Sequence, residues 1–241
     1  MKQTEKYKIN VHDTDYNGFL TPTGYLRYLQ DTAFCQMEHD GPSYDELFER
    51  GLAFILSRMR ILFFEPVRSH ENVISSTWAA GGHAASFVRC YEMTRDDGKP
   101  AAKGKSVWAL CDLNNKRLVR ISDVELNYAS DTENDVELPR KPEFAGEPAL
   151  LGTRKVFYTD VDQNRHMNNT RYADMLWHFI PDRDGRRITS LDISYLNEAP
   201  LGCELEIYGS ESSDGDGYVF KTVRSEDGKV NVLAKITSTK I

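Results

Sequence analysis

The segment Thr159–Tyr172 reads TDVDQNRHMNNTRY and decides the fold prediction, because it joins an extended apolar piece to an apolar helical run. Val156–Tyr158 precedes the segment and has the composition of a strand end. Apolar residues follow it at the three-to-four spacing of a helix face: Tyr172, Met175, Leu176 and Phe179. The polar residues therefore lie on the turn between a strand and a helix.

Three side chains with useful chemistry alternate along this turn: Asp162, Asn164 and His166. Residues two apart share one face of an extended segment, so a carboxylate, an amide and an imidazole are expected side by side. The first N–H groups of a helix lack intrahelical partners, so the helix start can hold a carbonyl oxygen or an oxyanion. Asp and Asn are also common turn and cap residues, which leaves a purely structural role open for them.

The composition excludes several classes of protein. A chain of 241 residues with 40% hydrophobic residues can form one large domain or two small ones. The net charge of −7 argues against bulk nucleic-acid binding, and no apolar run approaches the roughly 18 residues of a membrane span. Met1–Lys6 lacks the apolar region of a secretory signal, and the four cysteines form no C-x-x-C pair. We therefore expect a cytoplasmic protein without a zinc site.

The polar turn has a counterpart near the N-terminus. Asp15 and Asn17 align with Asp162 and Asn164 at one offset (162 − 15 = 147). The same offset pairs Thr23 with Thr170, Tyr25 with Tyr172 and Leu29 with Leu176. Further along, Glu65 aligns with Glu198 and Asp97 with Asp227 at shorter offsets, in the same order. This recurrence predicts two copies of one strand–helix–sheet unit.

Each copy is expected to be α+β, with an antiparallel sheet wrapped around one long helix so that the helix stripe and one sheet face are buried. The first copy begins with a short strand at Ile9–Val11 and a helix capped by Thr21. The second begins with a strand at Arg154–Tyr158 and a helix at Thr170–Phe179. The expected sheet strands are Phe54–Phe64, Asn72–Ala79, Ala85–Thr94, Ala102–Asp112, Ile188–Leu196, Cys203–Gly209, Tyr218–Arg224 and Val230–Thr239.

The predicted domains are residues 1–130 and 151–241, joined by a linker at 131–150. The stretch Asp131–Glu137 is acidic and weakly apolar, and Pro139, Pro142 and Pro148 follow it. Such a composition is typical of a partly extended connection rather than a packed element.

A helix wrapped by a sheet is the hot-dog fold, and the tandem form resembles the plant and bacterial acyl-[acyl carrier protein] thioesterases over nearly the whole chain. That family has an Asp-x-Asn-x-His motif followed by x-Asn-Asn-x-x-Tyr, and a Glu in a Leu-x-x-x-Tyr-x-x-Glu context. The matching residues here are Asp162, Asn164, His166, Asn168, Asn169 and Tyr172, then Leu191, Tyr195 and Glu198.

The resemblance implies a double hot-dog enzyme that hydrolyses fatty acyl thioesters to free fatty acid and acyl carrier protein. It implies catalytic roles for Asp162, Asn164, His166 and Glu198. Water would be activated by Glu198, alone or with His166. The N–H groups of Asn168 and Asn169 would stabilise the oxyanion.

No cofactor and no metal are expected, and the protein would be a monomer or a homodimer. Many family members have a Cys directly after the Glu, but this chain has Ala199 there, which excludes a cysteine acyl-enzyme at that position. Without a plant-like transit peptide, a bacterial cytoplasmic enzyme is implied.

The two copies differ at the imidazole, since the first copy has Phe19 at the position of His166. This asymmetry predicts one functional site, in the second copy. Two alternatives stay open. His12–Asp15 also resembles the aspartate-dependent hot-dog acyl-CoA thioesterases, in which catalysis would fall to Asp15, and a non-catalytic acyl-binding module would hold acyl groups without turnover.

Acyl carrier protein is acidic, and this chain is acidic too, so the proposed partnership requires a local basic surface. Basic residues do gather near the polar turn in sequence: Arg154, Lys155, Arg165, Arg171, Arg183, Arg186 and Arg187. An ordinary solvated face would explain them equally well.

Overall fold

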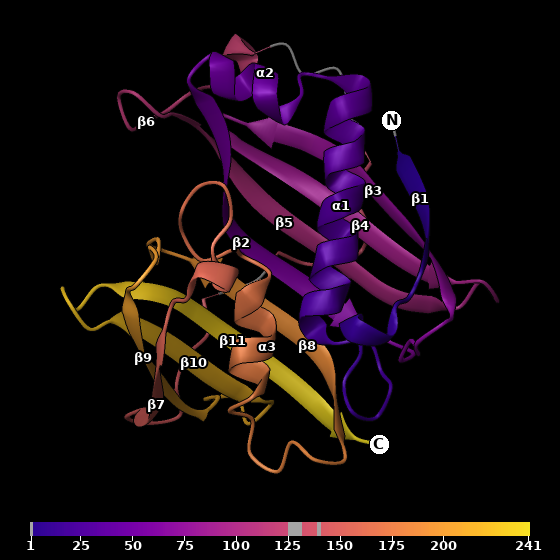
Figure 1. The fold of residues 1–241 in the computed structure, drawn as a ribbon, viewed down its shortest axis with the longest axis vertical. Helices are drawn as coiled ribbons and strands as arrows, with labels where there is room; N and C mark the ends of the chain where they lie inside the picture. The colour runs from indigo at the N-terminus through magenta and orange to yellow at the C-terminus, as the bar shows by residue number, and fades with distance from the viewer. Residues whose placement is uncertain (1, 125–131, 139–140) are drawn as a thin grey trace. The chain divides into compact units, whose positions relative to one another are not determined.

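The chain divides into two compact units, Met1–Leu138 and Pro139–Ile241, and each contains one antiparallel sheet and at least one helix (Figure 1). The computed structural model describes residues 2–124, 132–138 and 141–241, without the side chains of His83 and Ile121. The predicted domain boundary at 130/131 lies outside the described residues. No helix in the described part of the chain has the length and apolar character needed to span a membrane.

The sheet of the first unit has the strand order β1-β3-β4-β5-β2, with every neighbouring pair antiparallel. A short strand, β6, pairs with the C-terminal end of β5. The strands are β1 (Gln3–Lys8), β2 (Leu52–Phe63), β3 (Asn72–His83), β4 (Ser86–Arg95), β5 (Pro100–Asp112) and β6 (Arg117–Leu118), and two short helical turns are η1 (Val11–Asp13) and η2 (Ile121–Asp123).

Helix α1 (Pro22–Asp40) lies across one face of this sheet and packs on β1, β3 and β4 (Figure 1). The Gly24 N–H donates to the Thr21 hydroxyl at 3.0 Å, which confirms the predicted N-cap. The predicted apolar stripe, with Tyr25 and Leu29 among its members, is buried against the strands. A capping box at Ser43 starts the short helix α2 (Tyr44–Glu49).

The second unit repeats this plan with the strand order β8-β11-β10-β9-β7, again antiparallel throughout. Its helix α3 is shorter than the predicted Thr170–Phe179, because Phe179 and Ile180 donate to carbonyls three residues back instead of four. Pro181 then prevents the helix from continuing. The elements are β7 (Ala149–Lys155), η3 (Tyr158–Asp160), α3 (Arg171–Trp177), β8 (Arg186–Tyr195), β9 (Glu204–Glu211), β10 (Tyr218–Arg224) and β11 (Val230–Lys240).

The first strand of each unit lies earlier in the chain than predicted. β1 occupies Gln3–Lys8 rather than Ile9–Val11, and β7 occupies Ala149–Lys155 rather than Arg154–Tyr158. In both units a single 3-10 turn takes the place of the expected strand end. The error has one cause, since these first strands lie at the edge of a sheet and alternate between half-buried and exposed residues, which conceals their pattern.

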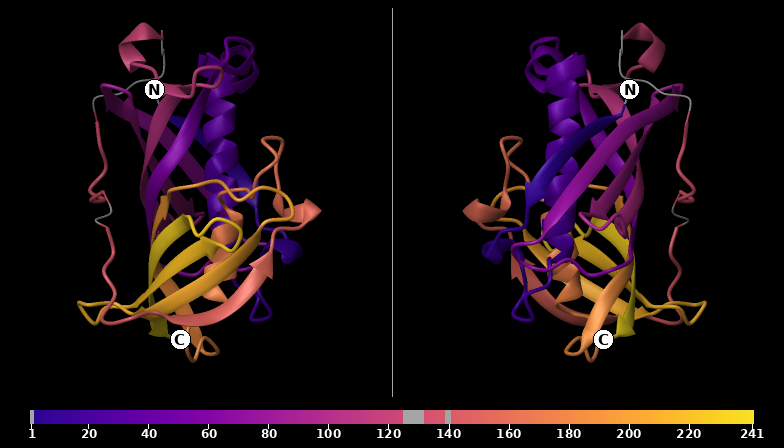
Figure 2. Two further views of the ribbon diagram at one scale, coloured as in Figure 1. Left: turned by 90° about the vertical axis from the view of Figure 1, so that its left-hand side faces the viewer. Right: turned by 90° about the vertical axis from the view of Figure 1, so that its right-hand side faces the viewer.

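Residues 132–138 are extended and are held against the strands of the first unit (Figure 2). The Trp78 indole N–H donates to the Thr132 carbonyl at 2.8 Å, and the buried Lys105 ammonium contacts Glu133 at 2.7 Å. The Asn134 amide donates to the carbonyls of Gly104 at 2.9 Å and Tyr91 at 3.3 Å. This part of the predicted linker therefore contacts the sheet more closely than its acidic composition suggests.

Replacing Asn134 with Ala should lower the free energy of unfolding by about 1–2 kcal/mol, because two carbonyls of the sheet lose their donor. Urea unfolding of the full chain measures this change. Asp135→Ala is the control, since its exposed ion pair with Lys103 is expected to leave stability unchanged. Equal stability of the Asn134 variant and the wild type would show that the segment is not held by these bonds.

Candidate active site

The polar turn of the second unit is a closed loop organised around Asp162. A β-bridge between Val161 and Met167 closes its two ends. The Asp162 Oδ1 accepts the Asn164 N–H at 2.9 Å, and the Asp162 N–H donates to the His166 carbonyl at 3.2 Å. These bonds form a side-chain turn of the kind that Asp favours, and they direct the chain back so that His166 pairs with Pro200 in the segment between β8 and β9.

Below the turn lies Asp160, a buried carboxylate to which sequence analysis gave no role. Its Oδ1 accepts from the Arg154 guanidinium at 2.6 Å, and its Oδ2 accepts from the Phe157 N–H at 3.0 Å. Its carbonyl accepts the Asn168 N–H at 2.9 Å. Asp160 therefore joins strand β7, the 3-10 turn and the start of the helical segment, and fixes the base of the site.

The same carboxylate in the first unit is Asp13, at the 147-residue offset. Asp13 is also buried, and it accepts from Arg27 at 2.9 Å and from the Tyr28 hydroxyl at 2.8 Å. The repeated Asp was the signal in the sequence that could have revealed this anchor.

The structure brings His166 and Glu198 together. The Met167 N–H donates to the Ala199 carbonyl at 2.8 Å, and His166 forms a β-bridge with Pro200. The His166 Nε2 consequently lies 3.8 Å from the Glu198 Oε1. The imidazole is 24% exposed and the carboxylate 70% exposed, so water can reach both groups.

The start of the helical segment offers one free N–H group rather than two. The Asn168 N–H is occupied by the Asp160 carbonyl, so the expected donation from Asn168 to an oxyanion is not available in this structure. No hydrogen bond among the described residues uses the Asn169 N–H as its donor. Because α3 has only seven residues, an anion placed here would interact with the Asn169 N–H more than with a long helix dipole.

Asn168 instead orients its neighbours with its side chain. Its Nδ2 donates to the Asp162 Oδ2 at 3.2 Å, while its Oδ1 accepts from the Thr170 N–H at 2.9 Å and the Thr170 hydroxyl at 2.7 Å. The amide therefore ties the turn to the start of α3. Asn164 is exposed, and the contact it makes with Asp162 uses its backbone N–H.

The first unit contains the same turn without the imidazole. A bridge between Thr14 and Leu20 closes it, and the Asp15 Oδ1 accepts the N–H groups of Asn17 at 2.8 Å and Phe19 at 3.0 Å. The Asp carboxylate, bonded to backbone N–H groups, thus builds the turn without an imidazole. This equivalence supports a structural contribution from the Asp162 carboxylate, to which Asn164 contributes its backbone N–H.

The hydrogen bonds also correct the sequence alignment after the turn. The Leu20 N–H donates to the Val67 carbonyl at 2.8 Å, as the Met167 N–H donates to the Ala199 carbonyl. Val67 and Ala199 are therefore equivalent, at an offset of 132 residues (199 − 67 = 132).

The position equivalent to Glu198 is consequently Pro66, and the alignment of Glu65 with Glu198 was wrong by one residue. Two arginines agree with this register, since Arg95 donates to the Pro66 carbonyl at 3.1 Å and Arg224 to the Glu198 carbonyl at 3.0 Å. The error arose because the Glu-Pro and Glu-Ala pairs look alike in sequence. The first unit therefore lacks both the imidazole and the carboxylate.

Cys203, the thiol nearest to Glu198 in sequence, is buried. Burial raises the pKa of this thiol, so the neutral form is favoured. This environment disfavours a cysteine nucleophile, in agreement with the absence of a cysteine at Ala199.

Each unit has an antiparallel sheet with a helix on its face, and in each unit the same polar turn precedes the helix. Two such units in one chain define a double hot-dog protein. The predicted fold class is confirmed, apart from the short helix of the second unit. The chain belongs to the acyl-ACP thioesterase family. The N-terminal domain of that family matches residues 1–127 and its C-terminal domain matches residues 150–240, so the family predicted from the sequence is also confirmed.

Two solved structures show the same fold. An acyl-ACP thioesterase from Bacteroides thetaiotaomicron has a TM-score of 0.89 and 23% sequence identity, covering 99% of this chain and 98% of that chain. The 12:0-ACP thioesterase from Umbellularia californica has a TM-score of 0.79 and 14% identity, covering 100% of this chain and 98% of that one.

A curated relative is similar in sequence as well. The chloroplastic palmitoyl-acyl carrier protein thioesterase of Arabidopsis thaliana is 21% identical over 232 residues. The match covers 84% of this chain but 55% of the Arabidopsis protein, so this chain spans about half the length of that relative.

Replacing Asp160 with Ala should lower the free energy of unfolding by about 2–3 kcal/mol, because Arg154 and the Phe157 N–H both lose a largely buried partner. Chemical denaturation measures the change. Asp216→Ala, at an exposed position of the same unit, is the control and should have little effect. Equal effects of the two substitutions would contradict the anchoring role of Asp160.

Proposed function

We propose that this protein hydrolyses fatty acyl thioesters of acyl carrier protein, releasing the free fatty acid and the carrier protein. The observation that carries the proposal is the contact of His166 with Glu198 in the one unit that has both groups. The first unit, built on the same turn, has Phe19 and Pro66 at these positions. Membership of the acyl-ACP thioesterase family supports the same reaction.

Water is the proposed nucleophile. A water molecule touching the Glu198 carboxylate and the His166 imidazole would lose a proton to this pair as its oxygen attacks the acyl carbonyl carbon. When the carbon–sulfur bond breaks, the departing sulfur takes up that proton, so the pair returns to its starting state. An imidazole can accept and return a proton near neutral pH.

The oxyanion that forms during attack would be stabilised by the Asn169 N–H. A hydrogen-bond donor at such a position is worth about 3 kcal/mol in comparable sites. The Tyr195 hydroxyl donates to the Asn169 carbonyl at 2.9 Å and holds this peptide in place. Asp162, Asn164 and Asn168 would shape the turn and, through Asn164, contact the water or the thioester.

Substitutions at His166, Glu198 and Asp15 distinguish the proposed function from the two alternatives. Replacing His166 with Ala or Glu198 with Gln should lower kcat on acyl carrier protein substrates by about 10²–10⁴-fold, as expected for loss of an acid–base group. Asp15→Ala should retain kcat, because the Asp15 carboxylate accepts from two N–H groups of its own turn.

Purified full-length variants assayed against acyl carrier protein substrates of graded chain length provide the measurement. Loss of activity only in the Asp15 variant would favour the acyl-CoA alternative. Binding of acyl groups without turnover by the wild type would favour the non-catalytic module.

A docking surface for the carrier protein is part of the proposal. Beside the site, Arg165 and Lys155 are exposed, whereas Arg154 is bonded to Asp160 and the Arg186 guanidinium to Ser238. Arg165 has a positive φ of 65°, where the first unit has Gly18 with a φ of 77°. A side chain in this conformation costs roughly 1 kcal/mol, so an arginine here is more easily explained by binding than by folding.

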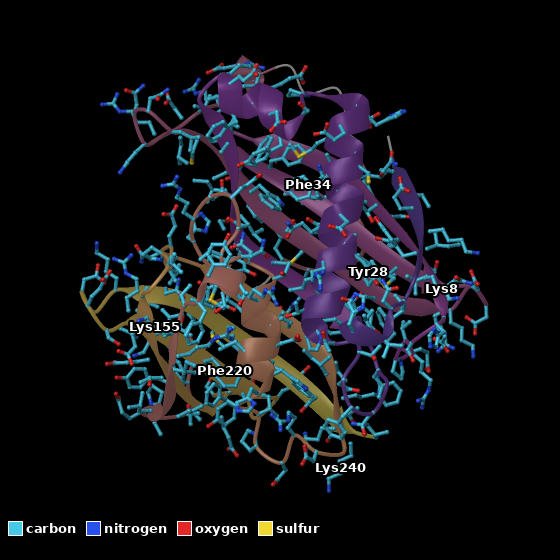
Figure 3. The ribbon with its side chains drawn as sticks, viewed as in Figure 1. Lys8, Tyr28, Phe34, Lys155, Phe220 and Lys240 are labelled. Carbon is cyan, nitrogen blue, oxygen red and sulfur yellow. The ribbon has the colours of Figure 1, made fainter. Side chains whose placement is uncertain are left out.

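Arg165→Gly should raise KM for the carrier-protein substrate several-fold and leave the free energy of unfolding within about 1 kcal/mol of the wild type. Its KM for a small soluble acyl thioester should not change, because that substrate has no acidic surface. Arg165→Lys retains the charge and should behave like the wild type. Lys240→Ala serves as a control for the loss of one exposed positive charge, and Figure 3 shows Lys240 well away from Lys155, the other exposed cation of the proposed surface. An equal rise in KM for both substrates would contradict the docking role.

A reducing, cytoplasmic setting completes the proposal. Cys35, Cys90, Cys111 and Cys203 are all unpaired, which fits such a compartment. A bacterial origin and a monomeric or homodimeric state stay predictions from the sequence.

A further inference from the structure

Strand β11 contains a β-bulge whose extra residue is Asn231. Thr222 pairs with Val232, and the next residue of β10, Val223, pairs with Val230. The Asn231 side chain is buried, with 1% of the residue exposed. A bulge redirects a side chain that regular alternation would place elsewhere, and a buried amide requires hydrogen-bond partners.

The partners of Asn231 lie on the segment that leads to Glu198. The Asn231 Nδ2 donates to the Asn197 carbonyl in a short hydrogen bond, and the Asn231 carbonyl accepts the N–H groups of Leu196 at 2.9 Å and Asn197 at 3.2 Å. The Thr222 hydroxyl donates to the Asn231 Oδ1 at 2.9 Å, which fixes the orientation of the amide. Three bonds from one residue therefore hold the two residues immediately before Glu198.

Asn231 also reaches the start of α3. Burial raises the pKa of the Tyr172 phenol and keeps it neutral, while the nearby Asn231 side chain acts in the opposite direction on that pKa. The Tyr172 ring meets the Tyr195 ring edge to face, with centroids 5.8 Å apart, and Tyr195 holds the Asn169 carbonyl. The Asn231 amide thus bonds the segment carrying Glu198 and lies beside the tyrosine pair that supports the peptide offering the proposed oxyanion donor.

The first unit has an equivalent β-bulge, but a different residue occupies the extra position. Met93 pairs with Ala102 and Thr94 with Pro100, so Ala101 is the extra residue of an equivalent bulge. The Phe64 N–H donates to the Ala101 carbonyl at 3.0 Å, as the Leu196 N–H does to that of Asn231. The backbone arrangement therefore forms with a methyl side chain, and the bulge alone does not explain the amide.

Arg224 also bonds the segment at Glu198, and a comparison with the first unit shows how its role differs from that of Asn231. Arg224 donates to the Glu198 carbonyl, but Arg95 makes the same bond to Pro66 in the unit without a site. The arginine is thus common to both units, whereas the amide occurs only where the imidazole and the carboxylate occur.

We infer that Asn231 is a positioning residue that sets the Glu198 carboxylate relative to His166 and to the Asn169 N–H. This inference rests on the proposed function, since it assigns Asn231 a role in the geometry of that reaction. Asn231 acts through the backbone of the 196–198 segment and makes no contact with the reacting atoms in this account.

Asn231→Ala tests the inference, because it gives the second unit the residue that the first unit has at its own bulge. We expect kcat on an acyl carrier protein substrate to fall by about tenfold to a hundredfold, with KM within about twofold of the wild type. The pH profile of kcat/KM should also change shape, because the distance between the two proton-carrying groups changes. A crystal structure of the variant should show the His166 Nε2 to Glu198 Oε1 distance increased beyond 3.8 Å.

Thr222 provides a second pair of variants. Thr222→Val removes the hydroxyl that orients the Asn231 amide and should lower kcat, whereas Thr222→Ser retains the hydroxyl and should restore it. Ser190→Ala is the control, since it removes a buried hydroxyl contact with Thr237 between β8 and β11, in the same sheet. It should lower the melting temperature without changing kcat or the pH profile.

The outcomes separate the inference from the proposed function. If Asn231→Ala lowers the melting temperature as Ser190→Ala does, while kcat, the pH profile and the crystallographic distance stay as in the wild type, Asn231 is merely structural and the inference is overturned. If the wild type cleaves no acyl thioester, the proposed function fails. In that case the crystallographic distance still decides whether Asn231 positions Glu198.

Discussion

The candidate site depends on one backbone pairing in the second unit. The hydrogen bond from Met167 to Ala199, with the bridge between His166 and Pro200, brings the end of the polar turn alongside the segment after β8. Residues far apart in sequence thereby place an imidazole and a carboxylate 3.8 Å apart. The buried Asp160 holds the turn from below, and Asn231 holds the opposing segment, so both sides of the pair are fixed by buried polar groups.

The two units show how a shared backbone carries a site in only one copy. The polar turn, the β-bulge and the supporting arginine occur in both units, and corresponding hydrogen bonds hold each of them in place. The differences lie in side chains: Phe19 against His166, Pro66 against Glu198, and Ala101 against Asn231. At each of these three positions the first unit has an apolar residue and the second unit has a polar one. The first unit thus serves as an internal reference for what the fold requires without chemistry.

Much of the fold and part of the candidate site were predictable from the sequence, for physical reasons. The stripe and cap of α1 are local signals, and the structure confirms both. The motif at Asp162–His166 and the distant Glu198 were found because both match the pattern of the acyl-ACP thioesterases, whereas Asp and Asn alone would fit an ordinary turn. The edge strands β1 and β7 were misplaced because half-exposed strands carry a weak alternation.

Other features depend on strand register, which the sequence leaves open. Glu65 was paired with Glu198 because a one-residue slip cannot be seen without the hydrogen bonds. The role of Asn231 was missed for the same reason, since a bulge is a property of two paired strands. Asn169 rather than Asn168 offers the free N–H, which only the Asp160 carbonyl contact reveals.

A double-mutant cycle of His166→Ala and Glu198→Gln on an acyl carrier protein substrate tests the central claim most directly, because it measures whether the two groups act as one unit. The account predicts strong non-additivity, so that the second substitution costs little once the first is present. Full additivity of the two losses, or wild-type kcat in either single variant, would contradict it.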